Sequence, residues 1–414
     1  MKNCYRRPWF RPILIAAVLL TIPLLPGSWW NPQGAPVADF VAPMSASAAE
    51  AVVAAARQNA RAHQEAVATA TSTPVPDQPA TIQTVYVAQS GHHISDRFGF
   101  LRFWRMHGSA LVFGYPISEE IEEGGRVVQY FERARFESHP EQQDPEQRVQ
   151  LALLGTLLTR GRDFAKAAPS SGEQFFPETE HGLSGPFYDF WRKHGGLPIF
   201  GYPISEPLQE VSAADGKTYT VQYFERARFE LHPEDMEPFY RNWATRKNLR
   251  LLTLYEVQLG DLGRQVAARK GYHFETSVQR PDAPTWSPEL WNRRIEVNLT
   301  TQSLTAYEDD TPVFQAPVAT AKAGYVTPTG TFAIYRKTPK RNMAGALGGE
   351  RWYVPNVPWV QYVVGGVALH GTYWHDKWGT GFRLSHGCIN LNIDDAQWLY
   401  DWASIGTTVH IFRS

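Results

Sequence analysis

The sequence has few cysteines and almost no net charge. Of its 414 residues only Cys4 and Cys388 are cysteines, too few for a disulfide framework or a multi-thiolate zinc site. The 40 basic and 41 acidic side chains leave a net charge of −1, whereas a dedicated nucleic-acid-binding protein needs a strongly positive field. We therefore expect no nucleic-acid partner.

The amino end lacks an apolar run as long as a membrane-spanning helix. The run at residues 13–25 is shorter than the ~20 residues that such a helix needs. Basic residues precede it, in the order typical of an export signal: Lys2, Arg6, Arg7 and Arg11. We interpret residues 1–30 as a signal peptide or membrane anchor, and 31–84 as a linker rich in Ala, Pro and Thr. The protein is then exported to the cell envelope, either secreted or anchored and facing outward.

The middle of the chain contains an internal repeat. Two segments recur at an offset of 87 residues and a third, unchanged in all ten positions, at an offset of 93: 103–108 as 190–195, 113–119 as 200–206, and 128–137 as 221–230. We assign repeat module 1 to residues 85–166 and repeat module 2 to residues 176–273. Each unit has the size of a small domain, and its turn and strand signals predict a mixed α and β fold.

The aromatic residues of these modules have two interpretations. The simpler one is that they fill small cores, because most Trp and Tyr side chains are used in packing. The alternative is that aromatic groups, together with Glu132, Arg133 and Arg135 on a strand, bind a cell-wall polymer. The turn Gly-Tyr-Pro-Ile-Ser-Glu at 114–119 and 201–206 resembles the LGFP-type repeats of exported bacterial proteins, a resemblance that implies attachment to the envelope.

The last third of the chain, 293–414, reads as a mostly β domain. Apolar and polar residues alternate from Ile295 onward, with turn residues between the apolar stretches. A helix is expected over 396–402, capped by Asp394 or Asp395. The candidate strands are 295–299, 304–306, 313–318, 331–335, 362–364, 367–369 and 408–412.

Within this domain, His370-Gly371 is followed by Ser385-His386-Gly387-Cys388-Ile389-Asn390. Cys4 lies in the export segment, so Cys388 has no disulfide partner in the chain and is a free thiol. It is either an inert buried residue or a nucleophile whose proton a nearby imidazole, such as His370, removes. Backbone N–H groups in the turn around Gly387 suit an oxyanion. Because Gly371 has no side chain, a backbone carbonyl would have to orient His370.

These residues resemble the signature of the L,D-transpeptidase catalytic domain (YkuD-like family), in which His-Gly is followed by Ser-His-Gly-Cys and an Asn two positions later. The segment 327–332 also resembles a threonine-proline-glycine loop of that family. The resemblance implies a β-sandwich with a short helix and no cofactor. It also implies the following roles: Cys388 as nucleophile, His370 as acid and base, His386 and Gly387 with Gly371 around the oxyanion hole, and Ser385 and Asn390 bracing the turn.

The resemblance further implies acyl transfer on peptidoglycan stem peptides, with a cross-link between third residues as the product. Water in place of the acceptor amine would give an L,D-carboxypeptidase. Two other readings remain open, a non-catalytic wall-binding protein and a zinc site made of His370, His375, His386 and Cys388. Aromatic residues near the motif are expected to pack, or else to form a substrate wall or lid: Trp352, Trp359, Tyr373, Trp374 and Trp378.

Overall fold

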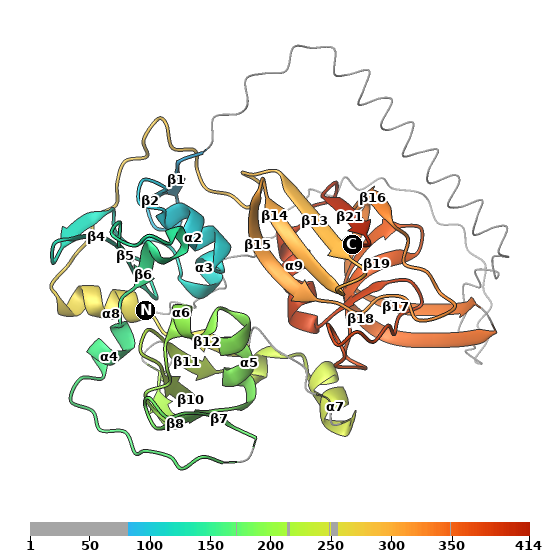
Figure 1. Ribbon diagram of the computed structural model, residues 1–414, viewed down its shortest axis with the longest axis horizontal. Helices are drawn as coiled ribbons and strands as arrows, with labels where there is room; N and C mark the ends of the chain where they lie inside the picture. Colours follow the sequence, from blue (N-terminus) through green and yellow to red (C-terminus); the bar gives the residue numbers. More distant parts are fainter. Residues whose placement is uncertain (1–81, 171, 213–215, 248, 250–255, 348) are drawn as a thin grey trace, which may run out of the picture. The chain divides into compact units, whose positions relative to one another are not determined.

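The computed structural model describes residues 82–170, 172–212, 216–247, 249, 256–347 and 349–414 (Figure 1), all of them within one compact unit. The export segment predicted for 1–30, and the linker predicted for 31–84 apart from its last three residues, lie outside these ranges. Among the described residues, no helix has both the length and the apolar character needed to cross a membrane.

Repeat module 1 begins with a hairpin and two short helices, followed by a four-stranded antiparallel sheet of order β3-β4-β5-β6. Its elements are β1 (Thr84–Val87), β2 (His92–Ser95), α2 (Phe100–Met106), α3 (Ser109–Val112), β3 (Ile121–Glu123), β4 (Arg126–Tyr130), β5 (Arg135–Ser138), η1 (Pro145–Gln147), β6 (Val149–Leu151) and α4 (Leu154–Leu158). Helix α2 ends at Met106, immediately before His107-Gly108.

Repeat module 2 has the same order of elements with one further helix, α7, between η2 and β12, and its sheet has the order β12-β11-β10-β9. The elements are β7 (Gln174–Phe176), β8 (His181–Leu183), α5 (Gly185–Lys193), α6 (Gly196–Phe200), β9 (Leu208–Val211), β10 (Thr218–Tyr223), β11 (Arg228–Leu231), η2 (Pro233–Asp235), α7 (Pro238–Lys247), β12 (Val257–Leu259) and α8 (Leu262–Arg269). The β7–β8 hairpin corresponds to β1–β2, so the structural repeat starts upstream of the recurring sequence.

Aromatic side chains form the core of each module. In module 1 the ring of Phe136 lies 4.8 Å from Phe113 and 4.1 Å from Phe131, measured between centroids. In module 2 Phe229 lies 4.9 Å from Phe200 and 4.2 Å from Phe224. All six rings are buried. The packing interpretation therefore accounts for these residues of the repeat.

The charged residues of the repeat motif make internal contacts. The Nε of Arg133 donates to the carbonyl of Leu259, at 3.2 Å, and the Nε of Arg226 donates to the carbonyl of Leu151, at 3.1 Å. Each arginine thus bonds to the last strand of the other module. Glu132 accepts from the backbone N–H of Tyr115. Glu132 and Arg133 lie in the turn between β4 and β5 and not on a strand, which the sequence had suggested. Of the charged residues named for polymer binding, Arg133 is used in the contact between the modules.

The last helix of each module also packs on the other module. The N–H of Thr156 in α4 donates to the carbonyl of Glu225, and the N–H of Arg264 in α8 donates to the carbonyl of Glu132, both at 3.1 Å. A Cβ on Gly155 or Gly263 would lie 1.9 Å from a carbonyl oxygen of the module opposite, that of Phe224 or Phe131. Glycine at these two positions lets each helix approach the neighbouring backbone.

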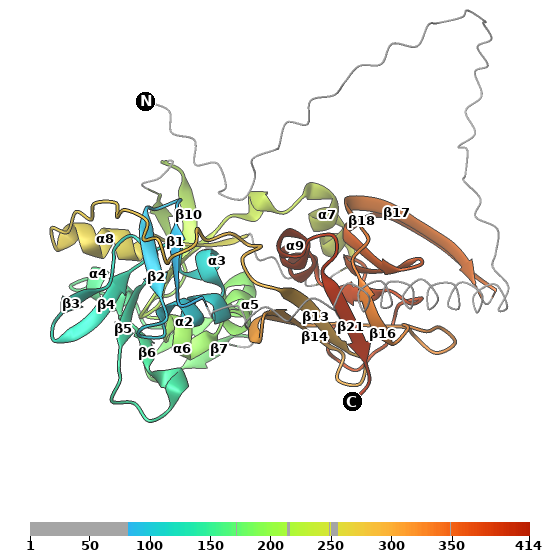
Figure 2. The same ribbon diagram turned by 90° about the horizontal axis from the view of Figure 1, so that it is seen from above.

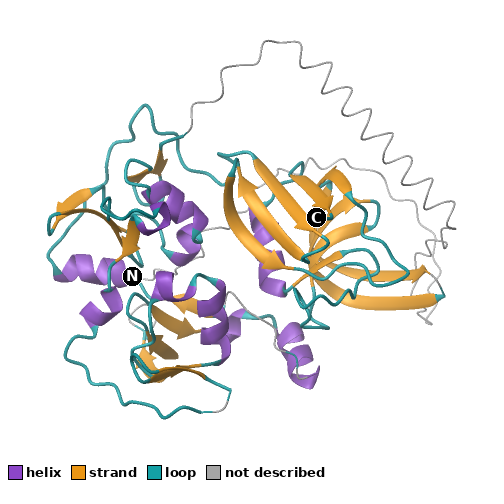
Figure 3. Cartoon of the chain, in the orientation of Figure 1, coloured by secondary structure: helices purple, strands orange, loops and turns teal. Residues whose placement is uncertain are grey.

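The carboxyl-terminal part is mostly β with one helix, as predicted, and strands dominate it in Figure 3. A five-stranded sheet has the order β15-β14-β13-β21-β16, and a four-stranded sheet has the order β17-β18-β19-β20. The bounds are β13 (Arg293–Asn298), β14 (Ser303–Glu308), β15 (Thr311–Pro317), β16 (Gly330–Ala333), β17 (Arg336–Leu347), β18 (Glu350–Val364), β19 (Val367–Gly371), β20 (Ile389–Leu391), α9 (Ile393–Trp402) and β21 (Thr408–Phe412).

One apolar cluster joins both sheets and α9, a helix that contacts β18 and β19 and is labelled with the strands of this part in Figure 2. Its members include Ile295, Leu304, Ile411, Leu369, Ile389 and Leu399. The apolar residues at alternate positions of the strands therefore face a shared interior, as the sandwich interpretation requires.

Three details differ from the sequence prediction, of which the first is that β20 was not among the candidate strands. Helix α9 starts at Ile393, and its N-cap is Asn392, whose side chain accepts from the N–H of Asp395. Asp394 and Asp395 therefore lie in the first turn and do not cap the helix. The long hairpin of β17 and β18 was not predicted, because β17 is rich in basic and small residues and lacks apolar alternation.

Candidate active site

The strands β19 and β20 bring the two predicted catalytic residues to one face of a sheet. They pair in parallel, with His370 opposite Asn390. Because side chains alternate along a strand, Cys388, two positions before Asn390, falls on the same face as His370 and Ala368. The sulfur packs against an apolar cluster that contains Ala368 and lies 3.7 Å from the carbonyl oxygen of Gly366. Cys388 as a residue is partly exposed.

His370 is buried, with 3% of its surface exposed. Its Nδ1 lies 3.0 Å from the carbonyl oxygen of Gly371. A carbonyl only accepts, so Nδ1 carries the proton and donates it, which leaves Nε2 as the basic nitrogen. Burial lowers the pKa of His370 to about 4, although the hydrogen bond to Gly371 acts in the opposite direction. The imidazole is therefore neutral at neutral pH.

Burial also raises the pKa of the Cys388 thiol, and a hydrogen bond from the backbone of Ala368 only partly opposes this effect. A thiol whose pKa is raised and an imidazole whose pKa is lowered are both neutral at pH 7. This differs from the sequence expectation that the imidazole ionises the sulfur in the free protein. Burial disfavours the charged form of both the Cys388 thiol and the His370 imidazole.

A tight turn positions Cys388. The hydroxyl of Ser385 accepts from the N–H of Gly387, at 3.1 Å, and donates to the carbonyl of Cys388, at 2.5 Å. Gly387 has φ +137°, a conformation that side-chain-bearing residues rarely adopt, and a Cβ there would lie 3.2 Å from the carbonyl oxygen of Val326. The N–H of Gly387, which we expected near an oxyanion, is directed to Ser385.

Thr327 supports this turn from the 327–332 loop. Its hydroxyl donates to the carbonyl of Gly387, at 2.9 Å, and accepts from the N–H of Ala321, at 3.1 Å. Sequence reasoning noted this loop but gave Thr327 no role. The signal that could have indicated this role is the position of Thr327 at the start of a loop that resembles the family.

Asn390 contacts a histidine rather than the turn. Its Nδ2 lies 3.2 Å from Nε2 of His375, and both residues are buried. Burial, together with the charge that His370 would carry, lowers the pKa of His375 to about 4. His375 is thus a second neutral imidazole behind the candidate site, which the sequence considered only as a zinc ligand.

The side chain of His386 points to the β17–β18 hairpin. Its ring stacks on Trp352, with centroids 3.9 Å apart and planes 7° apart, and its Nε2 lies 3.2 Å from a carboxylate oxygen of Glu350. Hydrogen bonds from Lys322, His386 and Tyr325 lower the pKa of Glu350 to about 2. Among the described residues, no group of three or more His, Cys, Asp or Glu side chains is arranged to hold a metal ion.

The aromatic residues near the motif divide between packing and the rim of the site. Tyr373 is fully buried and Trp378 is nearly so, and rings from α7 pack on Tyr373. Trp374 lies 5.9 Å from the ring of His370, whereas Trp352 covers His386. Packing is therefore the role of Tyr373 and Trp378, while Trp352 and Trp374 lie against the motif histidines.

Comparison with known proteins supports the sequence resemblance. Residues 292–411 match the YkuD family, described as L,D-transpeptidase catalytic domain. The chain is 30% identical over 125 residues, which is 30% of this chain and 68% of the other, to a Bacillus licheniformis protein named "Putative L,D-transpeptidase YkuD". It is also 30% identical over 159 residues, 38% of this chain, to "Probable L,D-transpeptidase ErfK/SrfK" of Escherichia coli.

The matched region thus defines an L,D-transpeptidase catalytic domain. The chain belongs to the YkuD family through this carboxyl-terminal domain. It spans about a third of the length of the Escherichia coli and Salmonella typhimurium relatives, 36% and 35%. Among solved structures, the catalytic domain of the E. faecium L,D-transpeptidase is 26% identical, with 30% of this chain and 99% of the other covered and a TM-score of 0.27.

Proposed function

We propose that this protein is an exported peptidoglycan L,D-transpeptidase that cross-links the third residues of stem peptides through a thioester on Cys388. The observation that supports the proposal most directly is the register of β19 and β20, in which the alternation of side chains assigns Cys388 to the face of His370, together with the partial exposure of Cys388. The hydrogen bond that leaves Nε2 of His370 as the base supports the same roles.

The neutral resting pair favours proton transfer during attack. As the sulfur of Cys388 bonds to the carbonyl carbon of the third stem residue, Nε2 of His370 takes the thiol proton. The carbonyl oxygen becomes an oxyanion. Since the N–H of Gly387 donates to Ser385, the N–H groups of His386 and Cys388 are the candidate donors to this oxyanion.

Collapse of the tetrahedral intermediate breaks the peptide bond, and His370 returns its proton to the departing amine of the terminal D-alanine. The product is a thioester on Cys388. An amine from a second stem then attacks the thioester, gives its proton to His370, and forms the new amide as the thiol is released. If water attacks instead, the same acyl-enzyme gives a carboxypeptidase, so the acceptor decides between the two activities.

The test uses the full chain with a tetrapeptide stem as donor and a second stem as acceptor. We expect a dimer and free D-alanine as products, and an acyl adduct on Cys388 when a carbapenem is added. Cys388→Ala should remove both the adduct and turnover. His370→Ala should lower kcat/KM by more than ~100-fold, whereas His410→Ala, on an exposed position of β21, should keep the wild-type rate.

The pH profile gives an independent check on the base. Burial lowers the pKa of His370 to about 4, so kcat/KM should persist from neutral pH down to about pH 5 and fall as the imidazole is protonated below that. Full activity of His370→Ala would reject the base assignment. If the wild-type protein is folded but forms no carbapenem adduct on Cys388, the result would favour a non-catalytic wall-binding protein.

A further inference from the structure

The two repeat modules place equivalent tryptophans in different surroundings. Trp104 and Trp191 each donate from Nε1 to the carbonyl of a glycine ten residues later, both at 3.0 Å. Trp104 has no exposed surface and its neighbour Tyr115 is buried, whereas Trp191 and the equivalent Tyr202 are partly exposed. The modules thus share the local bond and differ in what covers the rings.

A segment of the chain itself covers the surface in module 1. The ring of Trp286 lies 5.5 Å from Trp104 and 5.9 Å from Tyr115. The backbone N–H of Tyr86 in β1 donates to the carbonyl of Pro284, and the N–H of Trp286 donates to the carbonyl of Tyr86. Residues 284–286 are therefore added along the edge of β1, as an extended peptide that augments a sheet.

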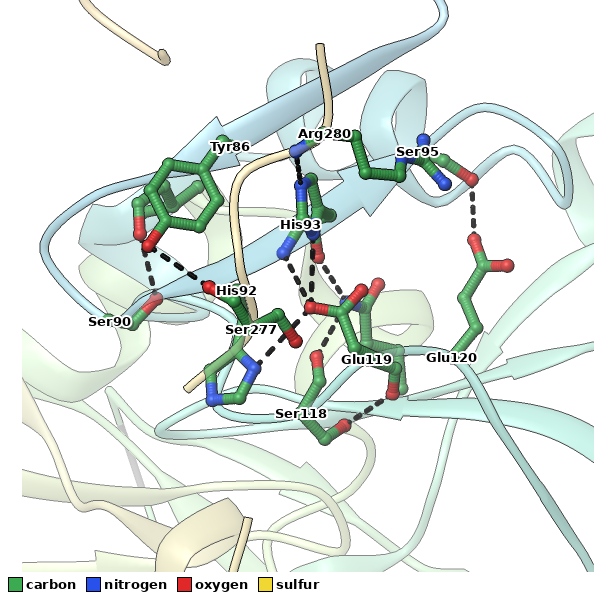
Figure 4. Close-up of polar contacts among 12 residues, drawn as sticks. Tyr86, Ser90, His92, His93, Ser95, Ser118, Glu119, Glu120, Ser277 and Arg280 are labelled. Atoms are coloured by element: carbon green, nitrogen blue, oxygen red, sulfur yellow. Dashed lines mark hydrogen bonds and ion pairs between the residues drawn. The ribbon is translucent and has the colours of Figure 1, made fainter. Parts of the chain in front are cut away.

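Further contacts hold this segment on the module. The N–H of Ser277 donates to the carbonyl of Gly91, at 2.7 Å, and the N–H of Arg280 donates to Nε2 of His93, at 3.0 Å. Figure 4 shows Ser277 and Arg280 approaching the histidines of β2 from the passing chain. Beyond the segment, Arg105 lies 3.8 Å from the ring centroid of Trp291. An aromatic, proline-containing peptide is thus the established occupant of this surface in module 1.

In module 2 the corresponding edge has no such segment among the described residues. Phe175 takes the place of Tyr86, because it lies opposite Gly182 in β8 as Tyr86 lies opposite His93 in β2. Strand β7 pairs with β8 alone in the described part of the chain. The carbonyl of Phe175 accepts the side-chain amide of Gln174.

The side chains beside this edge form an aromatic surface with one basic group. Tyr188 stacks on Trp191, with ring planes 20° apart, and the guanidinium of Arg192 lies 5.7 Å from the Tyr188 centroid. Phe176 contacts both Trp191 and Tyr202, yet the two rings stay partly exposed. Arg192, at the position of the buried Arg105, is exposed.

We propose that module 2 binds an extended, tryptophan-bearing segment of a partner protein along β7, over Tyr188, Trp191 and Tyr202. The internal repeat supports this choice of occupant, because the same surface of module 1 already holds a peptide of that kind. Main-chain hydrogen bonds to Phe175 provide the strand addition, and a tryptophan of the partner stacks on the exposed rings. An acidic residue of the partner pairs with Arg192.

The experiment measures binding of a fluorescein-labelled synthetic peptide with the sequence of residues 279–291 to the full chain, by fluorescence anisotropy. This peptide is the occupant of module 1 and carries Asp282 and Glu289. The intramolecular copy competes for module 1 at a high effective concentration, so the added peptide should report on module 2. We expect saturable binding with one site.

Variants separate the proposal from its alternatives. Trp191→Ala and the exposed Arg192→Glu should each weaken binding, the former by about tenfold, as should a peptide with Trp286→Ala. Val211→Ala, an exposed residue of β9, is the matched control and should bind normally. No saturable binding, or binding that Trp191→Ala and Arg192→Glu leave unchanged, would overturn the proposal. Binding of chitotetraose at Trp191 without binding of the peptide would also overturn the proposal, and it would indicate a glycan site.

Discussion

The two repeat modules share an unchanged ten-residue segment, 128–137 and 221–230, and their cores have the same ring arrangement around Phe136 and Phe229. They differ at an equivalent tryptophan, because Trp104 is fully buried and Trp191 is not. The difference comes from a segment more than 150 residues away from Trp104 in the chain. Local sequence therefore determines the core of each module, whereas distant chain determines which outer rings meet solvent.

The largest expected effect tests this contrast directly. Trp104→Ala removes a fully buried ring and should lower the free energy of unfolding by about 3–5 kcal/mol. Trp191→Ala removes a partly exposed ring and should cost about 1–2 kcal/mol. Urea unfolding of the two variants and the wild type measures both. Equal losses would mean that the covering segment contributes nothing to the burial of Trp104.

Trp286→Ala tests the covering segment itself. Loss of its buried ring should destabilise the protein by about 3 kcal/mol and should free the edge of β1. The labelled 279–291 peptide should then occupy two sites per chain in place of one, as titration at high protein concentration would reveal. A stoichiometry that stays at one, with the destabilisation present, would show that module 1 does not accept the peptide from solution.

Gly155→Ala and Gly263→Ala examine what the modules have in common. Each new methyl group would meet a backbone carbonyl at 1.9 Å, and the helix would have to shift, at a cost of about 1–3 kcal/mol. Because α4 and α8 exchange between the modules symmetrically, the two losses should agree within error. Thermal unfolding measures them, with Gly366→Ala as a control, because no atom lies within 4 Å of the new group and the backbone there is not left-handed. A large difference would show that the exchanged helices are not equivalent.

Much of the candidate site followed from sequence because its residues are close in the chain. The pair His370-Gly371 and the segment 385–390 carry the family signature, and the absence of a side chain at Gly371 pointed to a backbone carbonyl as the orienting group. The neutral state of Cys388 and His370 did not follow, because it depends on burial by residues from other strands. The support that Thr327 gives to Gly387 did not follow from the sequence either, because the two residues are far apart in the chain.

The fold shows the same division. Alternating strands such as β13 and β21 were found, whereas β17 was missed for lack of apolar alternation. The recurring sequence revealed two modules, but the exchange of α4 and α8 depends on tertiary packing that neither helix encodes alone. The β1–β2 and β7–β8 hairpins escaped notice because their sequences, TVYV and HHIS against QFF and HGL, show no recurrence.

The smallest expected effect concerns a histidine between two glutamates. His232 lies 3.5 Å from Glu230 and 3.4 Å from Glu234. Burial lowers the pKa of His232, but hydrogen bonding to Glu230 and the charges of both glutamates raise it above its ordinary value overall. The folded state therefore binds the proton more tightly than the unfolded state. The resulting stabilisation is fully present below the unfolded pKa of about 6.5 and is lost as pH rises through the folded pKa.

His232→Gln should then lower stability at pH 5.5 and have little effect at pH 8.5, as urea unfolding at the two pH values would measure. Glu234→Gln removes one of the two acidic neighbours and should give a smaller change with the same sign. His139 occupies the corresponding place in module 1, 3.6 Å from Glu137 and 3.1 Å from Glu141, and His139→Gln measured alongside shows how far that module shares the dependence. A larger loss for His232→Gln at pH 8.5 than at pH 5.5 would contradict the raised pKa, because a proton held more tightly in the folded state stabilises only at low pH.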